Sequence, residues 1–439
     1  MPRRDALQAA RAARGRRLSV KRATVLIAVN LAAFALSHGA RAQDLATAIA
    51  DTRAHSPELV AAEADAGAAE ARVAQARAAA GPTARIEGSI GYGRLDPGGY
   101  FGLSADDVTP SAVQFVGEYP LYAGGRIASA LDQAVAGHRA AKIGADMARQ
   151  NLALATVSSY AEVLTARELV ASYAALVAAH DEIVRHAALR YDVGDAASSE
   201  VAQARARRAE GQAGLVQAQG RLAAAEARLE RLTGKTVAVL AALPPRPEVP
   251  ASLGDAVDAA IAANAMLAQA GAAVDGADAG VRAAKASNRP MIGVFAEGAR
   301  VRDQFFPDYR ADSMTVGLRG RWTFFDSGAG GARVREAQAQ RSASAARLRQ
   351  ARDDVTQAVI EAWSGLESAE RGLEAAHEGD AAAREALRGT RLEVRSGARP
   401  PLAELDAERE AIAATARLAE ARAAVQVAAW RLRLLCGIE

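Results

Sequence analysis

Residues 313–331 read SMTVGLRGRWTFFDSGAGG, and residues 111–125 read SAVQFVGEYPLYAGG. In both stretches apolar residues or glycines alternate with more polar ones, as in Val316-Gly317-Leu318-Arg319. Alternation with a period of two predicts a β-strand with one apolar face and one polar face. About ten such residues are enough for a tilted strand to cross a bilayer. We therefore expect membrane strands here. The alternative that this pattern leaves open is a soluble hairpin over a small core.

Aromatic residues gather where these strands end, and a break at a proline precedes each of the two hairpins. Aromatic rings favour the boundary between lipid and water, because they are apolar but tolerate water at their edges. The expected membrane-interface aromatics are Tyr119, Tyr122, Trp322, Phe324 and Phe325. Pro82 and Pro290 mark where the chain enters two β-hairpins, which we place at 83–122 and 291–325.

The sequence is predicted to contain one unit twice. Residues 45–49 resemble 253–257 at an offset of 208, whereas 121–125 resemble 324–328 at an offset of 203. The two copies cover 43–242 and 253–439, and a proline-rich linker at 243–252 joins them. Each copy is expected to consist of a helix, a β-hairpin and a helical hairpin, and the first helix is expected to run continuously over residues 44–80.

Long coiled-coil helices follow each β-hairpin. Residues 126–191 contain no proline, and alanine and leucine recur at alternating spacings of four and three along residues 414–435. This heptad spacing is typical of coiled coils. We place the helical hairpins at 126–232 and 329–436, with turns at Gly194 and Gly397, because glycine accepts the left-handed turn conformation. The fold class is therefore α+β, with long antiparallel coiled-coil helices joined to a β-structure.

The first 42 residues are typical of a signal peptide. Basic residues precede an apolar stretch at 23–36, and small residues at Ala40 and Ala42 suit cleavage after Ala42. An uncleaved anchor is the alternative. Cleavage removes nine of the 54 basic residues and one of the 51 acidic ones, which leaves a net charge of −5. The basic character of the whole chain is thus no argument for nucleic-acid binding.

The single cysteine, Cys436, excludes a disulfide within the chain, and no cysteine is placed to carry a lipid anchor at the cleavage site. Beyond Ala42 we expect no apolar run long enough for a transmembrane helix. A secreted bacterial-type chain of this kind goes to the periplasm, to the medium, or to the outer membrane as a β-barrel. Four strands cannot close a barrel, and an open strand edge cannot face lipid. Membrane strands here would therefore require oligomerisation.

In the order of these features the chain resembles the TolC-like outer-membrane factors over essentially its whole mature length. That resemblance implies a homotrimer in the outer membrane, in contact with outer-membrane lipid. Each subunit would give four strands to one shared barrel, and the helices would continue it through the periplasm. The implied partners are a periplasmic adaptor, meeting the helical tips at Gly194 and Gly397, and an inner-membrane pump.

The same resemblance implies an aperture at the periplasmic end. By spacing from Gly397, Arg399 matches a latch arginine and Asp406 an aperture aspartate, with Glu404 close by. By spacing from Gly194, Ser199 and Glu200 match the partners of that arginine. Two positions depart from the family pattern, namely Ala403, where a second aspartate is expected, and Val394, where a tyrosine is frequent. The alternative is that these charges are simply solvated residues of a coiled coil.

No enzyme, cofactor or metal site is expected. The glycines of 328–331 lack both the dinucleotide pattern and a terminal Gly-Lys-Ser/Thr. The histidines show no paired ligand spacing. The predicted function is a passive exit duct of a tripartite export system, leaning to type I protein secretion because no lipid-anchor cysteine is present. The alternatives are drug or other small-molecule efflux and, in another class, a periplasmic coiled-coil adaptor or a secreted structural coiled coil.

Overall fold

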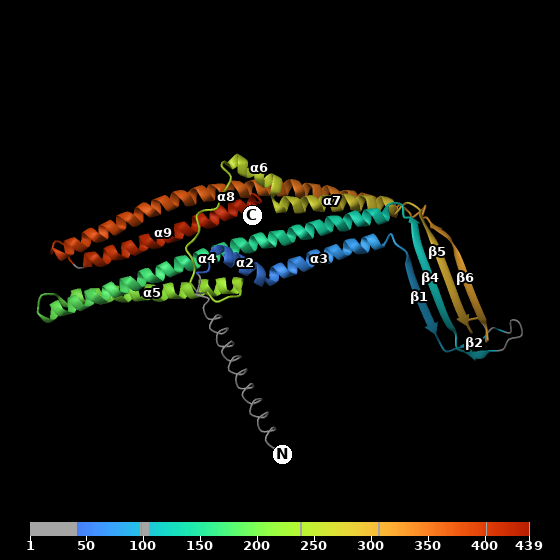
Figure 1. Cartoon of the computed structure of the whole chain (residues 1–439), viewed down its shortest axis with the longest axis horizontal. Helices are drawn as coiled ribbons and strands as arrows, with labels where there is room; N and C mark the ends of the chain where they lie inside the picture. The colour runs from blue at the N-terminus through green and yellow to red at the C-terminus, as the bar shows by residue number, and fades with distance from the viewer. Residues whose placement is uncertain are drawn as a thin grey trace, which may run out of the picture.

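Alanine-rich sequence forms long helices here, and the alternating sequence forms a sheet at one end of them (Figure 1). The computed structural model describes residues 42–96, 98, 105–237, 239–305, 308–400 and 402–438. The signal-peptide prediction for residues 1–42 therefore falls almost entirely outside the described residues. The helices are α2 Leu45–His55, α3 Pro57–Ala78, α4 Arg126–Asp192, α5 Ser198–Thr233, α6 Leu253–Ala263, α7 Ala265–Ala286, α8 Ala329–Arg395 and α9 Leu402–Leu435. The strands are β1 Thr83–Ile90, β2 Gly93–Leu95, β3 Asp106–Val108, β4 Ser111–Tyr122, β5 Met291–Arg302 and β6 Arg310–Arg321.

The helix predicted as continuous over residues 44–80 is in fact two helices. It breaks at Ser56, which is extended and whose hydroxyl accepts a hydrogen bond from the Leu59 amide at 3.2 Å. Pro57 then begins α3, where its missing N–H costs nothing because the first helical amides have no partner within the helix. A matching break separates α6 from α7 at Asn264, whose side chain accepts from the Met266 amide at 2.9 Å.

The main sheet has the strand order β1-β4-β5-β6, and every neighbouring pair is antiparallel. The register places most of the large apolar side chains of the four strands on one face, although Val116 and Phe295 lie on the other. Ile86 of β1 pairs with Phe115 of β4, and Val294 of β5 pairs with Leu318 of β6. The side chains on this face are exposed, and Leu318 retains 70% of its accessible surface. The strands therefore alternate as predicted, and their apolar face is bare in the isolated chain.

Two details of the hairpins differ from prediction. Strand β6 ends at Arg321, so Trp322, Phe324 and Phe325 lie beyond it in the connection to α8 rather than in the strand. Between β1 and β4 the chain also forms a second, two-stranded sheet from β2 and β3, which was not predicted. Its hydrogen bonds include Tyr92 Oη to Asp107 Oδ2 at 3.1 Å.

The glycine-rich turn at 328–331 begins helix α8, as expected for a strand-to-helix connection. Gly328 has a φ of 87°, in the left-handed region that favours glycine. The Asp326 carboxylate accepts from the Gly330 amide at 2.5 Å and from Arg333 at 3.0 Å. The chain's own carboxylate thus lies at this helix N-terminus, where an anion is stabilised by the free amides and the helix dipole.

The buried core lies midway along the helices, where α2 and α6 pack across the long pairs. One cluster contains Val157 and Leu229, and the other contains Val359 and Leu432; all four side chains are fully buried. The ring of Tyr160 lies within the first cluster. Small alanines dominate the rest of the helix contacts, so the helices approach closely but bury little apolar surface elsewhere.

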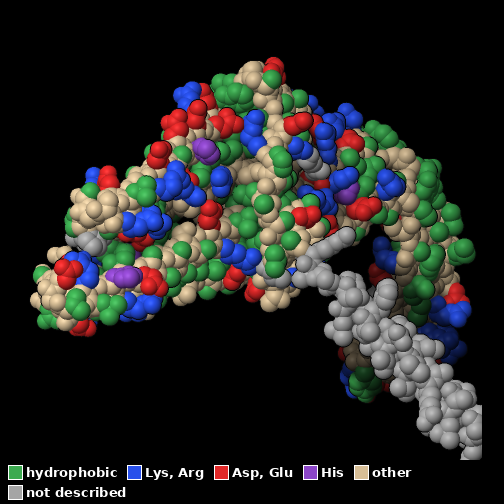
Figure 2. Space-filling model, turned by 60° about the vertical axis from the view of Figure 1, so that its left-hand side comes forward, with side chains coloured by type: hydrophobic (Ala, Val, Ile, Leu, Met, Phe, Trp, Pro, Cys, Tyr) green, Lys and Arg blue, Asp and Glu red, His purple; other side chains and the backbone are tan. Residues whose placement is uncertain are grey.

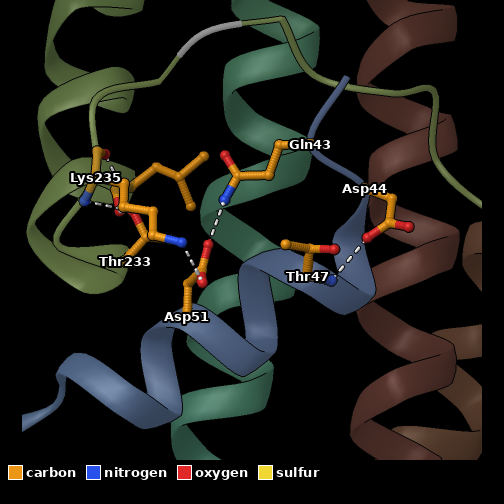
Figure 3. Close-up of polar contacts among 7 residues, drawn as sticks. Gln43, Asp44, Thr47, Asp51, Thr233 and Lys235 are labelled. Atoms are coloured by element: carbon orange, nitrogen blue, oxygen red, sulfur yellow. Dashed lines mark hydrogen bonds and ion pairs between the residues drawn. The ribbon is translucent and has the colours of Figure 1, made fainter. Parts of the chain in front are cut away.

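The start of the described chain is tied to this core (Figure 3). Gln43 forms a parallel bridge with Leu240, just before the linker. Its side chain donates to Asp51 at 3.1 Å, and Asp51 also accepts from the Lys235 ammonium at 2.7 Å. Asp44 accepts from the Thr47 amide at the start of α2, and hydrogen bonding to the side chain and then the amide of Thr47 lowers the pKa of the Asp44 carboxyl. The N-terminal segment is therefore held against the end of α5.

One helical stretch contradicts the expectation that no segment is long and apolar enough to cross a membrane. Leu253–Ala286 passes that test by length and composition. Its hydropathy comes mainly from alanine, and Asn264 interrupts it. In the structure α7 packs along α4 and α8, both of which carry many charged side chains. We therefore interpret it as a helix of the bundle.

Candidate functional site

The candidate site lies at the end of the helices farthest from the sheet, at the left of Figure 1. The chain turns there twice, from α4 to α5 and from α8 to α9. Gly194 and Gly397 have φ angles of 80° and 79°, so each takes the left-handed conformation predicted for these turns. No other atom lies near a Cβ built on either glycine, and Val193 is 79% exposed. Both tips are therefore open to a partner.

Arg190 closes the first tip. Its guanidinium donates to the Asp195 carboxylate at 2.9 Å and to the Glu200 carboxylate at 3.0 Å. Hydrogen bonding to Asp195 and the charge of Glu200 raise the pKa of Arg190. Glu200 thus has a partner on its own hairpin, whereas Ser199 beside it is exposed at the first turn of α5. Sequence reasoning did not single out Arg190.

Arg399 closes the second tip in a similar way. Its Nε lies 2.9 Å from the Glu393 carboxylate, and both side chains are about half exposed. Within one chain, Arg399 and Glu200 therefore pair with residues of their own hairpins and are not brought together. The predicted Arg399–Glu200 contact was placed between subunits, so it stays a prediction.

The two acidic aperture candidates are each held by an arginine. Glu404 accepts from Arg391 Nε at 3.1 Å, while Arg391 Nη2 donates to Glu408 at 2.6 Å. Asp406 lies 3.3 Å from Arg207 of α5, so this pair links the two helical hairpins. Asp406 remains 54% exposed and is free to line an opening as well.

A groove of about 300 Å³ lies between the hairpins at this level. It is lined by Arg190 and Glu200 from the first hairpin and by Val394 and Glu404 from the second. Val394 stands where the resemblance led us to expect a tyrosine, so the groove lacks that hydroxyl. The structure thus collects Glu200 and Glu404 around one hollow, although they lie 204 residues apart in the sequence.

The five predicted interface aromatics lie at the other end of the helices, where the sheet begins. All five are exposed, from 44% for Tyr119 to 84% for Phe324. The Trp322 ring packs edge-on against Phe324, and its N–H donates to the Asn288 carbonyl at 3.2 Å. Figure 2 shows hydrophobic side chains along the sheet at the right of the view, whereas the helices display mixed charges.

The opposite face of the sheet is polar. Arg319 donates to Glu297 at 2.6 Å and to Glu118 at 3.4 Å, so it joins three strands. Its guanidinium also lies 4.2 Å from the centre of the Phe295 ring. An exposed apolar face backed by a polar, charged face is what a barrel strand requires, with lipid outside and water inside.

Known proteins of similar sequence identify the family of this chain. The model of the outer membrane efflux protein family matches residues 48–235 and 256–438. The chain belongs to that family. This membership confirms the resemblance seen in the sequence, and it places the efflux-family chain in the outer membrane, extending into the periplasm.

Relatives of this family member include the outer membrane efflux protein BepC of Brucella suis biovar 1 (strain 1330), which is 26% identical over 284 residues. That match covers 64% of this chain and 62% of BepC. The fold is similar to that of VceC from Vibrio cholerae, with a TM-score of 0.74, 18% identity, and coverage of 90% of this chain and 96% of that one. It is also similar to the open state of the Neisseria gonorrhoeae MtrE outer membrane channel, with a TM-score of 0.73, 18% identity, and coverage of 90% and 89%.

Several residues of this efflux-family chain escaped sequence reasoning. Arg207 pairs with Asp406, and Arg391 pairs with Glu404. In each pair the two residues come from different helices, so no local spacing predicts the contact. His180 continues the heptad seam of α4 and is buried, but no local spacing indicates its acidic neighbour Glu408 on α9. Among the residues that the structure describes, no group of three His, Cys, Asp or Glu side chains is placed to hold a metal.

Proposed function

We propose that this protein is the outer-membrane channel of a tripartite export system and works as a passive exit duct from the periplasm to the medium. The observation that carries the proposal is the four-stranded sheet with one exposed apolar face and two open edges, β1 and β6. Open edges leave backbone groups without partners, which lipid does not tolerate. A homotrimer in which β6 of one subunit pairs with β1 of the next closes a single barrel and removes every edge.

The two halves of the chain support the same proposal. Each half presents two short helices, two strands of the main sheet and one long helical hairpin, in that order. We infer from this order that the chain is a two-fold repeat, with a helical tunnel continuing the barrel into the periplasm. At 1.5 Å per residue, the 67 residues of α4 span roughly 100 Å, enough for a long duct.

The tips at Gly194 and Gly397 are the proposed contacts for a periplasmic adaptor and, through it, for an inner-membrane pump. The proposed aperture consists of Asp406 and Glu404, and the proposed latch joins Arg399 of one subunit to Glu200 and Ser199 of the next. Replacing both Arg399 and Glu200 by alanine is expected to raise the conductance in planar bilayers. Unchanged conductance would reject the latch without rejecting the channel.

For cargo, we propose small-molecule efflux first and type I protein secretion second. This order reverses the sequence-based leaning, because the family and BepC are both named for efflux. A strain lacking this gene product is expected to become more sensitive to amphiphilic drugs while its culture medium keeps its set of secreted proteins. Loss of a secreted protein at unchanged drug sensitivity would restore protein secretion as the first candidate.

The decisive experiment is fractionation of the expressed protein combined with chemical cross-linking. A trimer in the outer membrane fraction, with Gln43 as its first residue, is the expected result. A soluble periplasmic monomer would contradict the proposal, because the strands would then not lie in a membrane. That outcome would favour a periplasmic adaptor or a structural coiled coil.

A further inference from the structure

A buried histidine and a buried glutamate meet where the two helical hairpins touch. His180 of α4 and Glu408 of α9 are each only 4% exposed, and His180 Nε2 lies 3.7 Å from Glu408 Oε2. That distance is too long for a hydrogen bond. Both ring nitrogens of His180 and the Oε2 atom of Glu408 have no hydrogen-bond partner. Such groups are costly to bury, so their position calls for an explanation.

The His180 side chain also packs against α5. His180 occupies a seam position of α4, one turn beyond the buried Leu176. On α5, a Cβ built on Gly211 would lie 3.4 Å from Leu176 and 3.5 Å from His180 Nδ1. Both distances are ordinary van der Waals contact, so the imidazole lies directly against the backbone of α5 at Gly211.

The charges around His180 leave one acidic group without a full partner. On α9, Glu404 and Glu408 share the single guanidinium of Arg391, which comes from α8. The hydrogen bond from Arg391 reaches Oε1 of Glu408, so Oε2 faces only His180.

The remaining charges nearby are already paired. On α4, Asp181 binds Arg208 of α5, and Arg207 of α5 binds Glu210 and Asp406. These five acidic groups face only three arginines, so a positive charge on His180 reduces the excess of negative charge in the cluster from two to one.

We propose that His180 and Glu408 form a pH-sensitive clamp between the two helical hairpins of each subunit. When the imidazole is protonated it pairs with Glu408 and holds α9 against α4. When the imidazole is neutral this pair is lost and the first turns of α9 are released, beside Glu404 and Asp406 of the proposed aperture. The functional role of this clamp rests on the proposed channel, but the existence of the clamp can be tested without a channel assay.

The direction with pH follows from proton linkage. A clamp held by a charged imidazole is stronger when the proton is present, so acid favours clamping and a rise in pH favours release. Histidine is the side chain that ordinarily changes charge between pH 5 and 8, so the test compares two pH values across that window. Hydrogen bonding to Glu408 raises the pKa of Arg391, so that guanidinium stays charged throughout the window.

The test is hydrogen exchange of the full-length protein in detergent at about pH 5.5 and pH 8, with rates corrected for intrinsic exchange. We expect peptides from residues 176–190 and 402–414 to open about tenfold more often at the higher pH, which corresponds to ~1.4 kcal/mol. His180→Leu suits the apolar seam and cannot titrate, so its exchange should be the same at both pH values. His186→Gln is the matched control on the same helix, since His186 is exposed, and it should keep the wild-type response.

Glu408→Gln provides a second, independent variant, because it removes the partner charge and keeps the imidazole. It too should lose the pH response, and it decides the question where His180→Leu fails to assemble. Equal corrected exchange at both pH values in the wild type would overturn the clamp, as would a response that persists in His180→Leu. Bilayer recordings are separate: absence of any pore would refute the proposed function, while the exchange result would still stand or fall by itself.

Discussion

Tyr160→Phe is the substitution whose effect the structure defines best. The Tyr160 side chain is fully buried, and its hydroxyl lies 2.7 Å from both the Gln43 and the Ala241 carbonyl oxygens. Burial raises the pKa of Tyr160, so the hydroxyl keeps its proton and remains a donor. The two carbonyls share the one hydroxyl proton, so this side chain of α4 ties the segment just before α2 to the segment just before the linker.

The size of the stability loss in Tyr160→Phe depends on which hydrogen-bond partners the two carbonyls keep. Gln43 O also accepts from the Ala241 amide at 3.0 Å, so it keeps a partner in the variant. Ala241 is partly exposed, so water can replace the lost hydroxyl at its carbonyl. A buried hydrogen bond contributes about 0.5–1.5 kcal/mol net to stability, and the loss is larger where water replaces the hydroxyl only incompletely. We expect a loss of about 1–2 kcal/mol, confined to this junction.

Hydrogen exchange of the Ala241 amide and of the first turn of α2 measures this loss directly. A cost of 1–2 kcal/mol corresponds to roughly 5- to 30-fold faster local opening. Tyr191→Phe is the control, because Tyr191 is half exposed, and it should leave these amides unchanged. Less than a twofold change in Tyr160→Phe would refute the reasoning, since the hydroxyl would then not hold the two segments.

Three further predictions concern the C-terminal residues and the sheet. Gly397→Ala should cost the detergent-solubilised protein only the ~1–2 kcal/mol of left-handed backbone strain. Gly437→Ala should cost more than that, because its new methyl would also lie 2.7 Å from the side chain of the last residue of α6. Equal melting temperatures of the two variants would contradict this prediction. Cys436 is 2% exposed and its burial raises the thiol pKa, so maleimide should label it at pH 7 only after unfolding; rapid labelling of the native protein would disprove that packing. Val316→Arg, on the apolar face of the sheet, should cost about 2–4 kcal/mol and lower the amount in the outer membrane, whereas Thr315→Arg on the polar face should be tolerated; equal membrane levels of the two variants would reverse the assignment of the faces.

Elements with a strong local signal were predicted well. The alternation around Leu318 gave the strand and its two faces, and the glycines at 194 and 397 gave the turns. The break at Ser56 was missed although its signal was present, since a serine followed by proline is a good helix start. The run of alanines on both sides made the helix read as continuous. The equivalent break at Asn264 is marked only by one asparagine among alanines.

The site was predicted less completely, because its contacts join helices that are distant in sequence. The spacing from each turn singled out Glu200, Glu404 and Asp406, which lie near the helical ends, but it said nothing of their partners. Arg207 and Asp406 lie on different hairpins, so only the packing of α5 beside α9 brings them together. Similarly, the heptad seam of α4 favours burial of His180, but nothing local indicates that Glu408 of α9 lies beside it.

The two open edges of the sheet have a genetic consequence. In the proposed trimer each subunit supplies a third of one barrel, so one subunit with a defective sheet disrupts the barrel that it shares with two normal subunits. A cell that makes normal and defective chains in equal amounts would build only about one fully normal trimer in eight by random mixing. Lesions in β1 or β6 that still permit pairing at one edge should therefore behave as dominant alleles, whereas lesions that prevent the chain from folding at all should be recessive.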